Sequence, residues 1–333
     1  MNRQRGRQLR VHIHSPPPSY AIEELRAALE PKIELSFGGE ALPRETELLV
    51  CGRPTREQLA LCPQLRVLVI PYAGVPASTR ELVLSEFPEL TVCNLHHNAA
   101  VAAELAVSLL LAAAKKVVAA DVALRQGDWT IRYEGESMKI MDGKTVLILG
   151  LGAIGSRVAA VCHSLGMKVL AVRKNPEQVH PPYIGVHGLG AVGAVLAQAD
   201  AVVICLPLTP ETEGLIGKRE LEALPSSAVV VNVARGRIVG EEALYHALLE
   251  RRIAAAGIDV WYRYPRSVDE RGSTFPSQFP FHKLDNVVMS PHRGGAFRTE
   301  EVERKRMHEL AETLNAIARG EPVPHRVDLV AGY

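Results

Sequence analysis

The chain has 333 residues, enough for two domains that each bury a core of their own. Its formal net charge is +1, which indicates neither a nucleic-acid partner nor binding to an anionic membrane. The apolar runs are too short or too rich in alanine to span a membrane, and the basic start is not followed by the apolar core of a signal peptide. The five cysteines are scattered without C-x-x-C spacing, which predicts no disulfide framework and no metal site and favours the cytoplasm.

The first hundred residues alternate short apolar runs with helical patterns. Strands are predicted at Leu9–Ile13, Lys32–Phe37, Glu47–Cys51, Val67–Ile70 and Leu90–Asn94. Helices are predicted between them at Ala21–Leu29, Thr55–Leu61 and Thr79–Glu86. Such alternation predicts a doubly wound domain with a parallel sheet.

An alanine- and leucine-rich stretch then predicts one long helix over Ala99–Ala120, buried because it is apolar on most sides. After a polar connection, six buried strands and their helices predict a second parallel sheet: Val146–Leu149, Lys168–Val172, Ala201–Leu206, Ala228–Ala234, Ala255–Trp261 and Asn286–Met289. A charged amphipathic helix is predicted over Phe297–Ala318, and we expect it to return to the first domain. We therefore expect a discontinuous substrate-binding domain of residues 1–98 and 297–333, and a dinucleotide-binding domain of residues 99–296.

The second sheet opens with KTVLILGLGAIG, in which Gly150, Gly152 and Gly155 give the spacing G-x-G-x-x-G between a strand and a helix. The first glycine permits a tight turn, the second lets the backbone approach a pyrophosphate, and the third lets helix and strand pack closely. The diphosphate would lie on free N–H groups at the positive end of the helix. In this context the motif predicts a dinucleotide-binding site.

Three polar loops follow later strands of this sheet. Arg235 follows one strand, where its guanidinium would grip a carboxylate, although a surface ion pair is the alternative. His292 follows the last strand and would give a proton to a carbonyl oxygen, although a lone histidine is more often structural. Asp259 ends the strand between them and would orient the cofactor or cap a turn.

Together, the glycines and these loops resemble the D-isomer-specific 2-hydroxyacid dehydrogenases, a family that includes glyoxylate/hydroxypyruvate reductases, phosphoglycerate dehydrogenase and formate dehydrogenase. The motifs that carry the resemblance stand in family order: PYAGV at 71–75, NAAVAAE at 98–104, GDW at 127–129, LPLTPETEGLIG at 206–217, NVARGRIV at 232–239, AAGIDVW at 255–261 and SPHRGG at 290–295. The resemblance covers nearly the whole chain. It implies an α/β fold of two doubly wound parallel-sheet domains, one a Rossmann domain and the other flavodoxin-like.

The resemblance also implies roles for individual residues. Arg235 would bind and polarise a 2-oxo acid, and His292 would be the acid/base. The backbone of Ala73, Gly74 and Val75 would hold the substrate carboxylate, with Asn98 also at the substrate. The implied cofactor-binding residues are Gly150, Gly152, Ala153, Ile154, Gly155, Arg173, Lys174, Leu206, Pro207, Thr212, Val233, Ala234, Asp259, Gly294 and Gly295. The family further implies a homodimer formed through the nucleotide domain.

Two departures from the family pattern refine these expectations. Members that prefer NAD carry an aspartate after the second strand of the dinucleotide-binding sheet, where this chain has Arg173 and Lys174. Two cations at this place would attract the 2′-phosphate of NADP(H), so NADP(H) is favoured as the cofactor and NAD(H) is still possible. The glutamate that usually bonds the catalytic histidine is replaced by Tyr264, a neutral phenol. We therefore expect His292 to be a weaker base than in its relatives, unless Asp269 or Glu270 of the following loop supplies a carboxylate.

The leading interpretation is an oxidoreductase that passes a hydride between NADP(H), or NAD(H), and a small 2-oxo or 2-hydroxy acid such as glyoxylate or hydroxypyruvate. A formate-dehydrogenase-like enzyme is the first alternative, because Asn98 and the missing glutamate agree with it. A non-catalytic dinucleotide-sensing binding protein is the second, since fold alone does not settle function.

Overall fold

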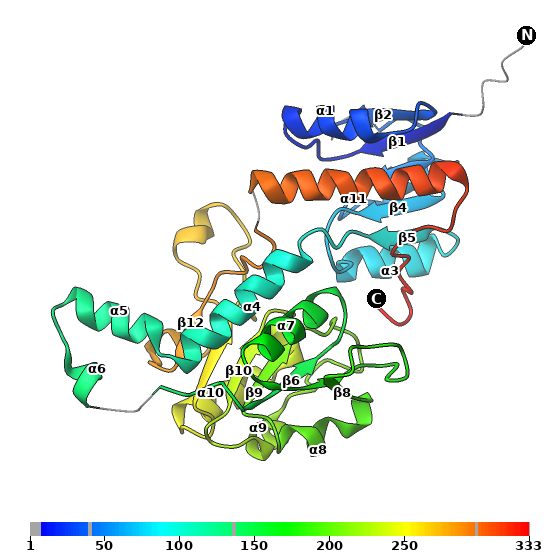
Figure 1. Ribbon diagram of the computed structural model, residues 1–333. Helices are drawn as coiled ribbons and strands as arrows, with labels where there is room; N and C mark the ends of the chain where they lie inside the picture. Colours follow the sequence, from blue (N-terminus) through cyan, green and yellow to red (C-terminus); the bar gives the residue numbers. More distant parts are fainter. Residues whose placement is uncertain (1–7, 39–41, 135–137, 297–298, 333) are drawn as a thin grey trace, which may run out of the picture. The chain divides into compact units, whose positions relative to one another are not determined.

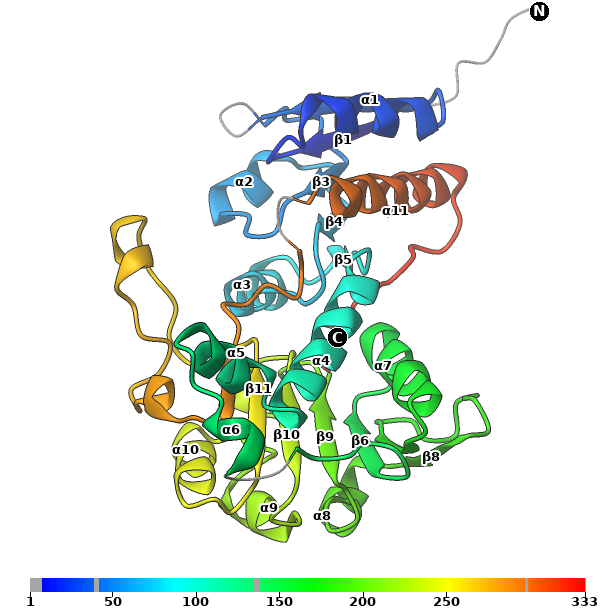
Figure 2. The same ribbon diagram turned by 60° about the vertical axis from the view of Figure 1, so that its left-hand side comes forward.

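The computed structural model describes residues 8–38, 42–134, 138–296 and 299–332, which fold into two compact units. The first unit comprises Met1–Asn98 and Ala296–Tyr333, and the second comprises Ala99–Gly295. Within the described ranges, no helix is both long and apolar enough to cross a membrane. Figures 1 and 2 show the elements of each unit.

The first unit is built on a five-stranded parallel sheet with the strand order β2-β1-β3-β4-β5, which is the flavodoxin-like order. Its strands are β1 (Leu9–Ile13), β2 (Ile33–Phe37), β3 (Leu48–Val50), β4 (Val67–Ile70) and β5 (Thr91–Asn94). Its helices are α1 (Ser19–Ala28), α2 (Arg56–Leu61), α3 (Ala77–Glu86) and α11 (Glu300–Arg319). Each predicted element of this unit is present, with ends shifted by one or two residues; residues 297–298 of the predicted last helix lie outside the described residues.

Helices cover both faces of this sheet, because its strands carry apolar side chains on both sides. Leu25 of α1 and Leu310 of α11 pack on one face, where α1 and α11 lie side by side (Figures 1 and 2). Leu59 of α2 and Val83 of α3 pack on the other face. After α11 the chain returns to the edge strand β5, where the Val327 N–H donates to the Val92 carbonyl at 2.8 Å.

The second unit is built on a seven-stranded parallel sheet with the order β12-β11-β10-β9-β6-β7-β8. Its strands are β6 (Thr145–Leu149), β7 (Lys168–Val172), β8 (Ile184–His187), β9 (Ala201–Ile204), β10 (Val229–Asn232), β11 (Ala255–Ile258) and β12 (Val287–Met289). Its α-helices are α4 (Ala99–Ala114), α5 (Val117–Arg125), α6 (Thr130–Tyr133), α7 (Ala153–Ser164), α8 (Val192–Leu196), α9 (Lys218–Ala223) and α10 (Glu241–Leu249). The order of its first six strands across the sheet is that of the Rossmann fold, so the predicted fold class is confirmed for both sheets.

Two predictions for this unit are wrong in detail. The sheet has seven strands instead of six, because β8 is a short edge strand that contains Gly185 and gives little apolar signal. The long helix predicted over Ala99–Ala120 ends at Ala114, because Lys116 adopts a left-handed conformation with φ of 53°. A separate helix, α5, starts at Val117 and has no buried residue.

The predicted strands β9, β10 and β11 also end earlier than their apolar runs. Leu206, Val233 and Ala234 are buried although they lie in loops, as are Val260 and Trp261. The first residues of these loops are therefore buried against the sheet, and the polar residues follow them in the chain.

Candidate active site

The glycine-rich turn between β6 and α7 shows the tight turn at Gly150 and the close helix packing at Gly155 that its spacing predicts. Gly150 has φ of +99°, and a Cβ there would lie 2.9 Å from backbone atoms of Cys205 and Leu206. A Cβ on Gly155 would lie 1.9 Å from the Gly150 carbonyl oxygen, so α7 packs closely on the turn. A Cβ on Gly152 would meet nothing within 4 Å. The turn therefore leaves open space at the first N–H groups of α7, beginning with Ala153 and Ile154, which fits a diphosphate.

At the end of the neighbouring strand β7 stand two cations. The Arg173 N–H donates to the His187 carbonyl of β8 at 3.0 Å, and its guanidinium donates to the Gln178 amide oxygen. Arg173 is half-buried and Lys174 is exposed. The position where a ribose-binding carboxylate would stand is thus occupied by a guanidinium.

The loop after β9 lies beside the glycine-rich turn, since a Cβ on Gly150 would meet backbone atoms of Cys205 and Leu206. The Thr212 hydroxyl donates to the Pro207 carbonyl at 2.6 Å and accepts from the Thr209 N–H at 2.8 Å. Thr212 is buried, so its hydroxyl shapes this loop internally.

The loop after β10 presents Arg235 and is held by Asn232, which is 2% exposed. The Asn232 amide oxygen accepts from the Ala234 N–H at 3.0 Å, and its amide nitrogen donates to the Arg235 carbonyl at 3.0 Å. The Arg235 guanidinium donates to the Ala234 carbonyl at 2.6 Å. A Cβ on Gly236 would lie 2.5 Å from the Trp261 carbonyl oxygen, so a glycine is needed where this loop meets the next one.

The Asp259 carboxylate holds the loop that carries His292. Asp259 is 1% exposed; one of its oxygens accepts from the Ser290 hydroxyl and from the Arg293 N–H at 2.7 Å. Its other oxygen accepts from the Gly294 N–H at 2.9 Å. Between these bonds His292 has φ of +57°, a conformation that non-glycine residues rarely adopt. The carboxylate therefore fixes the backbone on both sides of His292, and Gly295 directly follows this segment.

Tyr264 does contact His292, but through its ring. The two ring centroids are 5.6 Å apart with an interplanar angle of 55°. The Tyr264 phenol oxygen accepts a hydrogen bond from the Trp261 N–H at 2.9 Å, which anchors the side chain. The Glu270 carboxylate accepts from the Arg266 N–H within its own loop. Among the charges that act on His292 are those of Arg235 and Asp259.

The pKa values of His292 and Tyr264 are shifted by burial and by nearby charges. The pKa of His292 is lowered from its ordinary value, first because the ring is partly removed from water and then because the Arg235 guanidinium disfavours an imidazolium. The Asp259 carboxylate opposes both effects. The pKa of Tyr264 is raised, mainly because burial disfavours a phenolate, so this side chain is neutral at physiological pH.

The remaining predicted site residues belong to the first unit. Ala73, Gly74 and Val75 follow β4 in a half-buried loop in which Gly74 has φ of +81°. Asn98 is the last residue of the N-terminal stretch of the first unit. Its buried amide oxygen has no hydrogen-bond partner among the described residues. The structure thus brings Arg235, Tyr264, Asp259 and His292 together in the second unit.

Three supporting residues were missed by sequence reasoning. Asn232 holds the Arg235 loop, the Ser290 hydroxyl donates to Asp259, and the Trp261 indole donates to the Ser290 carbonyl at 2.8 Å. All three stand inside the motifs quoted above, next to the residues that they support. Their position inside these motifs was the signal that could have identified them. The motifs alone do not show which hydrogen bonds these side chains make.

A seven-stranded sheet that opens with this glycine-rich turn, together with a separate five-stranded parallel sheet, defines a two-domain α/β protein of the Rossmann-like dehydrogenase fold. The family model described as "D-isomer specific 2-hydroxyacid dehydrogenase, NAD binding domain" matches residues 107–294, more than half of the chain. The chain belongs to the D-isomer-specific 2-hydroxyacid dehydrogenase family, which confirms the resemblance seen in its motifs.

Individual relatives agree with this assignment. The chain is 33% identical over 328 residues to D-3-phosphoglycerate dehydrogenase of Archaeoglobus fulgidus, which covers 96% of this chain and 59% of that protein. It is 36% identical over 229 residues to glyoxylate reductase of Korarchaeum cryptofilum, covering 68% of this chain and 65% of that one. The aligned part of the chain thus spans less than two thirds of either curated relative.

Among solved structures, a D-isomer specific 2-hydroxyacid dehydrogenase from Xanthobacter autotrophicus Py2, in complex with NADPH and MES, is similar over 98% of this chain and 100% of that chain. Its TM-score is 0.80 and its sequence identity 26%.

Proposed function

We propose that the chain is an NAD(P)-dependent 2-hydroxyacid dehydrogenase that acts as a reductase of small 2-oxo acids, such as glyoxylate or hydroxypyruvate. The observation that carries this proposal is the pairing of Arg235 with His292, close enough for the charge of one to lower the pKa of the other. A guanidinium binds a carboxylate, and an imidazole transfers a proton. Both side chains lie in loops that follow strands of the sheet that carries the glycine-rich turn. Similarity to glyoxylate reductase supports this substrate class.

In the proposed reaction, a bound reduced nicotinamide dinucleotide would supply the hydride that the keto carbon of the substrate accepts. Arg235 holds the substrate carboxylate and draws electron density toward the keto oxygen. His292 in its protonated form gives a proton to that oxygen as it gains negative charge. The neutral imidazole then takes a proton from solvent before the next turnover.

The second unit would hold the dinucleotide, with the diphosphate at Gly152, Ala153 and Ile154, where the structure leaves open space. The loops after β9, β10 and β12 would flank the nicotinamide half. We assign the first unit to substrate binding, with the N–H groups of Ala73–Val75 and the amide of Asn98 as its contacts. The unpartnered amide oxygen of Asn98 supports this assignment, because a substrate would give it a partner.

For the cofactor we propose a preference for NADP(H) over NAD(H). Arg173 and Lys174 follow β7, where a 2′-phosphate would meet two cations, and the Xanthobacter relative was crystallised with NADPH. Replacing Arg173 with Ser should lower kcat/KM for NADPH about tenfold or more and leave that for NADH within about twofold. Equal losses with both cofactors would count against the proposed 2′-phosphate contact.

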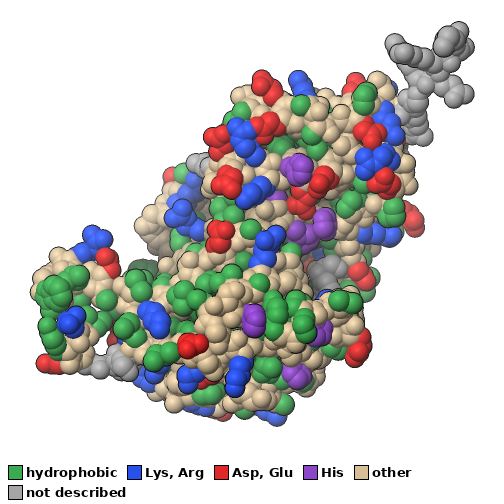
Figure 3. All heavy atoms as spheres, viewed as in Figure 1, with side chains coloured by type: hydrophobic (Ala, Val, Ile, Leu, Met, Phe, Trp, Pro, Cys, Tyr) green, Lys and Arg blue, Asp and Glu red, His purple; other side chains and the backbone are tan. Residues whose placement is uncertain are grey.

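We further propose a homodimer formed through α5, α6 and the segment that follows them. Large apolar side chains are exposed along this stretch, including Val122 at 52%, Trp129 at 57%, Tyr133 at 76% and Ile140 at 68%. Figure 3 shows hydrophobic side chains gathered over this part of the chain. An apolar patch of this kind favours burial against a second copy. Analytical ultracentrifugation of Val122→Asp should then show monomers where the wild-type chain sediments as a dimer.

We place the protein in the cytoplasm, because all five of its cysteines are free thiols and four of them are buried in the two cores. Such thiols behave as small apolar side chains and persist unpaired in a reducing compartment. Fractionation of the native cells, with detection by antibody, tests this placement.

The experiment that tests the reaction follows NADPH and NADH oxidation by absorbance against a panel of 2-oxo acids. Wild-type turnover that falls at least a hundredfold in His292→Ala, with unchanged dinucleotide binding, is the expected result. Formate oxidation that does not respond to His292→Ala would favour the formate-dehydrogenase-like alternative. Tight dinucleotide binding without turnover of any acid would favour a binding protein.

A further inference from the structure

The turn after β7 brings a second polar side chain, Gln178, to Arg173, the cation proposed to contact the 2′-phosphate of NADP(H). The strand ends at Val172, and the Gln178 N–H donates to the Asn175 carbonyl at 3.3 Å, which closes the turn. Because the chain folds back here, the Arg173 guanidinium reaches the Gln178 side chain and donates to its amide oxygen. Gln178 is therefore part of the surroundings of the proposed 2′-phosphate contact.

The acceptor in this hydrogen bond carries no charge. An amide restricts the rotation of the Arg173 guanidinium but leaves its positive charge uncompensated. A carboxylate stands one residue earlier in the same turn, yet Glu177 forms no ion pair with the residues that the structure describes. The turn therefore offers Arg173 a neutral partner although an acidic one is next to it.

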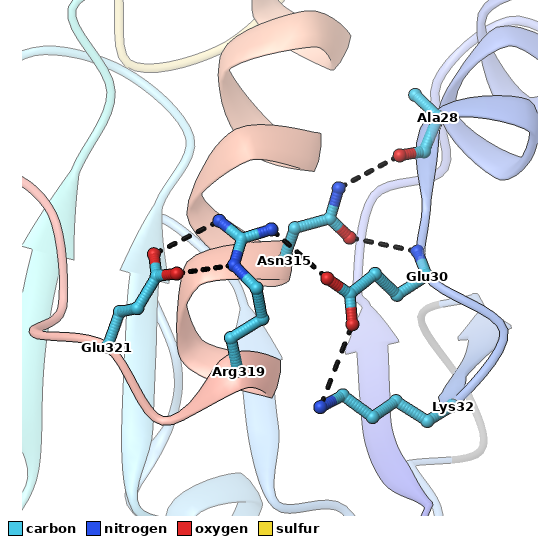
Figure 4. A network of polar contacts seen from close by, with 6 residues as sticks. All are labelled: Ala28, Glu30, Lys32, Asn315, Arg319 and Glu321. Carbon is cyan, nitrogen blue, oxygen red and sulfur yellow. Dashed lines mark hydrogen bonds and ion pairs between the residues drawn. The ribbon is translucent and has the colours of Figure 1, made fainter.

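Arg319 of the first unit shows the opposite arrangement (Figure 4). Its guanidinium donates to the Glu321 carboxylate at 2.5 Å and to the Glu30 carboxylate at 3.1 Å. Arg237 of the second unit is likewise paired with a carboxylate. Carboxylates hold these guanidinium groups but also offset their charge, so an incoming anion would meet a neutralised group. Arg173 is held in place and keeps its charge available.

The same amide of Gln178 also offers hydrogen-bond donors. Its nitrogen carries two N–H groups, and it has no hydrogen bond to any residue in the described part of the chain. Gln178 is exposed and Arg173 is half-buried, so an anion in solvent can reach both. A phosphate monoester carries a charge of about −1.5 to −2 at neutral pH and has three acceptor oxygens, so it can accept from both side chains at once.

From these observations we propose that Gln178 is a specificity-determining residue of the cofactor site. Its amide oxygen holds the Arg173 guanidinium in place, and its amide nitrogen donates to the 2′-phosphate of NADP(H). A carboxylate at this position would also hold the arginine, but it would offset the positive charge and repel the phosphate. This inference rests on the proposed preference for NADP(H) and assigns part of that preference to a neutral side chain.

The test uses two fragments of the cofactor, adenosine 2′,5′-bisphosphate and adenosine 5′-monophosphate, which differ only in the 2′-phosphate. Isothermal titration calorimetry of the full chain, without 2-oxo acid, gives the dissociation constant of each fragment. The wild-type chain should bind the bisphosphate at least tenfold more tightly than the monophosphate. Gln178→Glu should reduce this ratio at least tenfold and Gln178→Ala about threefold, while the dissociation constant of the monophosphate stays within about twofold.

Gln198→Glu is the matched control, because it adds the same charge at another exposed glutamine of the second unit. Gln198 precedes β9, so it lies at the edge of the parallel sheet where the strands begin, whereas Arg173 follows the end of β7. The control should leave the ratio of the two dissociation constants within about twofold of the wild-type value. Gln178→Ala is a second variant that adds no charge.

A ratio that stays unchanged in both Gln178 variants would overturn the role of Gln178 and leave the preference for NADP(H) standing. Equal binding of the two fragments by the wild-type chain would overturn that preference and this inference with it. An equal loss of affinity for both fragments in Gln178→Glu would also overturn the inference, because the effect would then not act through the 2′-phosphate. Since no substrate is turned over, these outcomes are independent of the reductase assay.

Discussion

In the second unit the buried Asp259 carboxylate accepts three hydrogen bonds, and one buried side-chain atom, Asn286 Oδ1, has no partner among the described residues. In the first unit three buried side-chain atoms have no such partner. Those atoms are His97 Nδ1, Asn98 Oδ1 and Arg306 Nε. A buried polar group that is bonded contributes to stability and fixes geometry, whereas an unpaired one costs free energy. The comparison teaches that the chemistry around His292 is organised by its own unit, while the polar residues at Asn98 are not satisfied within theirs.

Replacing Asp259 with Asn disrupts the fully hydrogen-bonded carboxylate of the second unit and should have the largest effect on stability and activity. The amide nitrogen cannot accept a hydrogen bond, so at least one N–H donor of the His292 loop is left buried without a partner. We expect the free energy of unfolding to fall by about 2–4 kcal/mol and kcat/KM to fall by about a hundredfold or more, because His292 is displaced. Denaturant titration and steady-state kinetics measure these quantities. Wild-type activity in Asp259→Asn would contradict the positioning role of Asp259.

Replacing Asn232 with Ala removes the two bonds that shape the Arg235 loop and should have the next largest effect. The free energy of unfolding should fall by about 2 kcal/mol, because the Ala234 N–H loses its acceptor in a buried place. The KM for the 2-oxo acid should rise about tenfold, with a smaller change in kcat, since Arg235 is less fixed. The exposed Gln198→Ala is the control and should change neither quantity.

Replacing Tyr264 with Glu places a carboxylate beside His292 and tests its electrostatics. Reduction requires the protonated imidazole, so the wild-type rate should fall as pH rises through the lowered pKa of His292. A nearby carboxylate favours the imidazolium, and the descending limb should move to higher pH by about one unit. Tyr264→Gln, which stays neutral, should leave the limb near its wild-type position. Coincident profiles for all three proteins would refute this account of His292.

Replacing His97 with Phe tests one of the buried groups of the first unit that lack a partner among the described residues. At neutral pH it should have the smallest effect, changing the free energy of unfolding by no more than about 1 kcal/mol. Burial, with help from Arg306 and His96, lowers the pKa of His97 to about 4. The unfolded chain takes up this proton near pH 6.5, so the folded state loses stability as pH falls from about 6.5 toward 4.

After allowance for partial exposure, this loss amounts to about 2 kcal/mol. Denaturant titration at pH 7.5 and 4.5 should show that His97→Phe reduces the difference by that amount. An unchanged difference would show that another group dominates the acid sensitivity.

The strands that frame the site could be predicted because apolar runs such as Val146–Leu149 are buried on both faces and need no tertiary context. β8 could not be predicted, because a half-exposed edge strand needs little apolar sequence. The break after Ala114 depends on a left-handed lysine, and no glycine or proline announces it. Apolar runs also extend past the true strand ends, since loop residues such as Trp261 are buried as well.

For the candidate site, the sequence placed Arg235, Asp259 and His292 at the carboxyl ends of neighbouring strands, because parallel connectivity alone requires it. It could not predict that Asp259 accepts three bonds, since donors such as the Gly294 N–H depend on the loop conformation. It also could not predict that the phenol of Tyr264 is bonded to the Trp261 N–H while its ring faces His292. Those details depend on backbone angles that residue types do not fix.

The place of α11 in the fold has a consequence for the order in which the protein forms on the ribosome. Met307, Leu310 and Leu314 of this helix are part of the core of the first unit, although the strands of that unit are made at the start of the chain. The second unit is continuous in sequence and has its whole core before α11 is synthesised. The unit that is translated first therefore completes its core last, because the face of its sheet that α1 and α11 share is covered by α1 alone until α11 has been made.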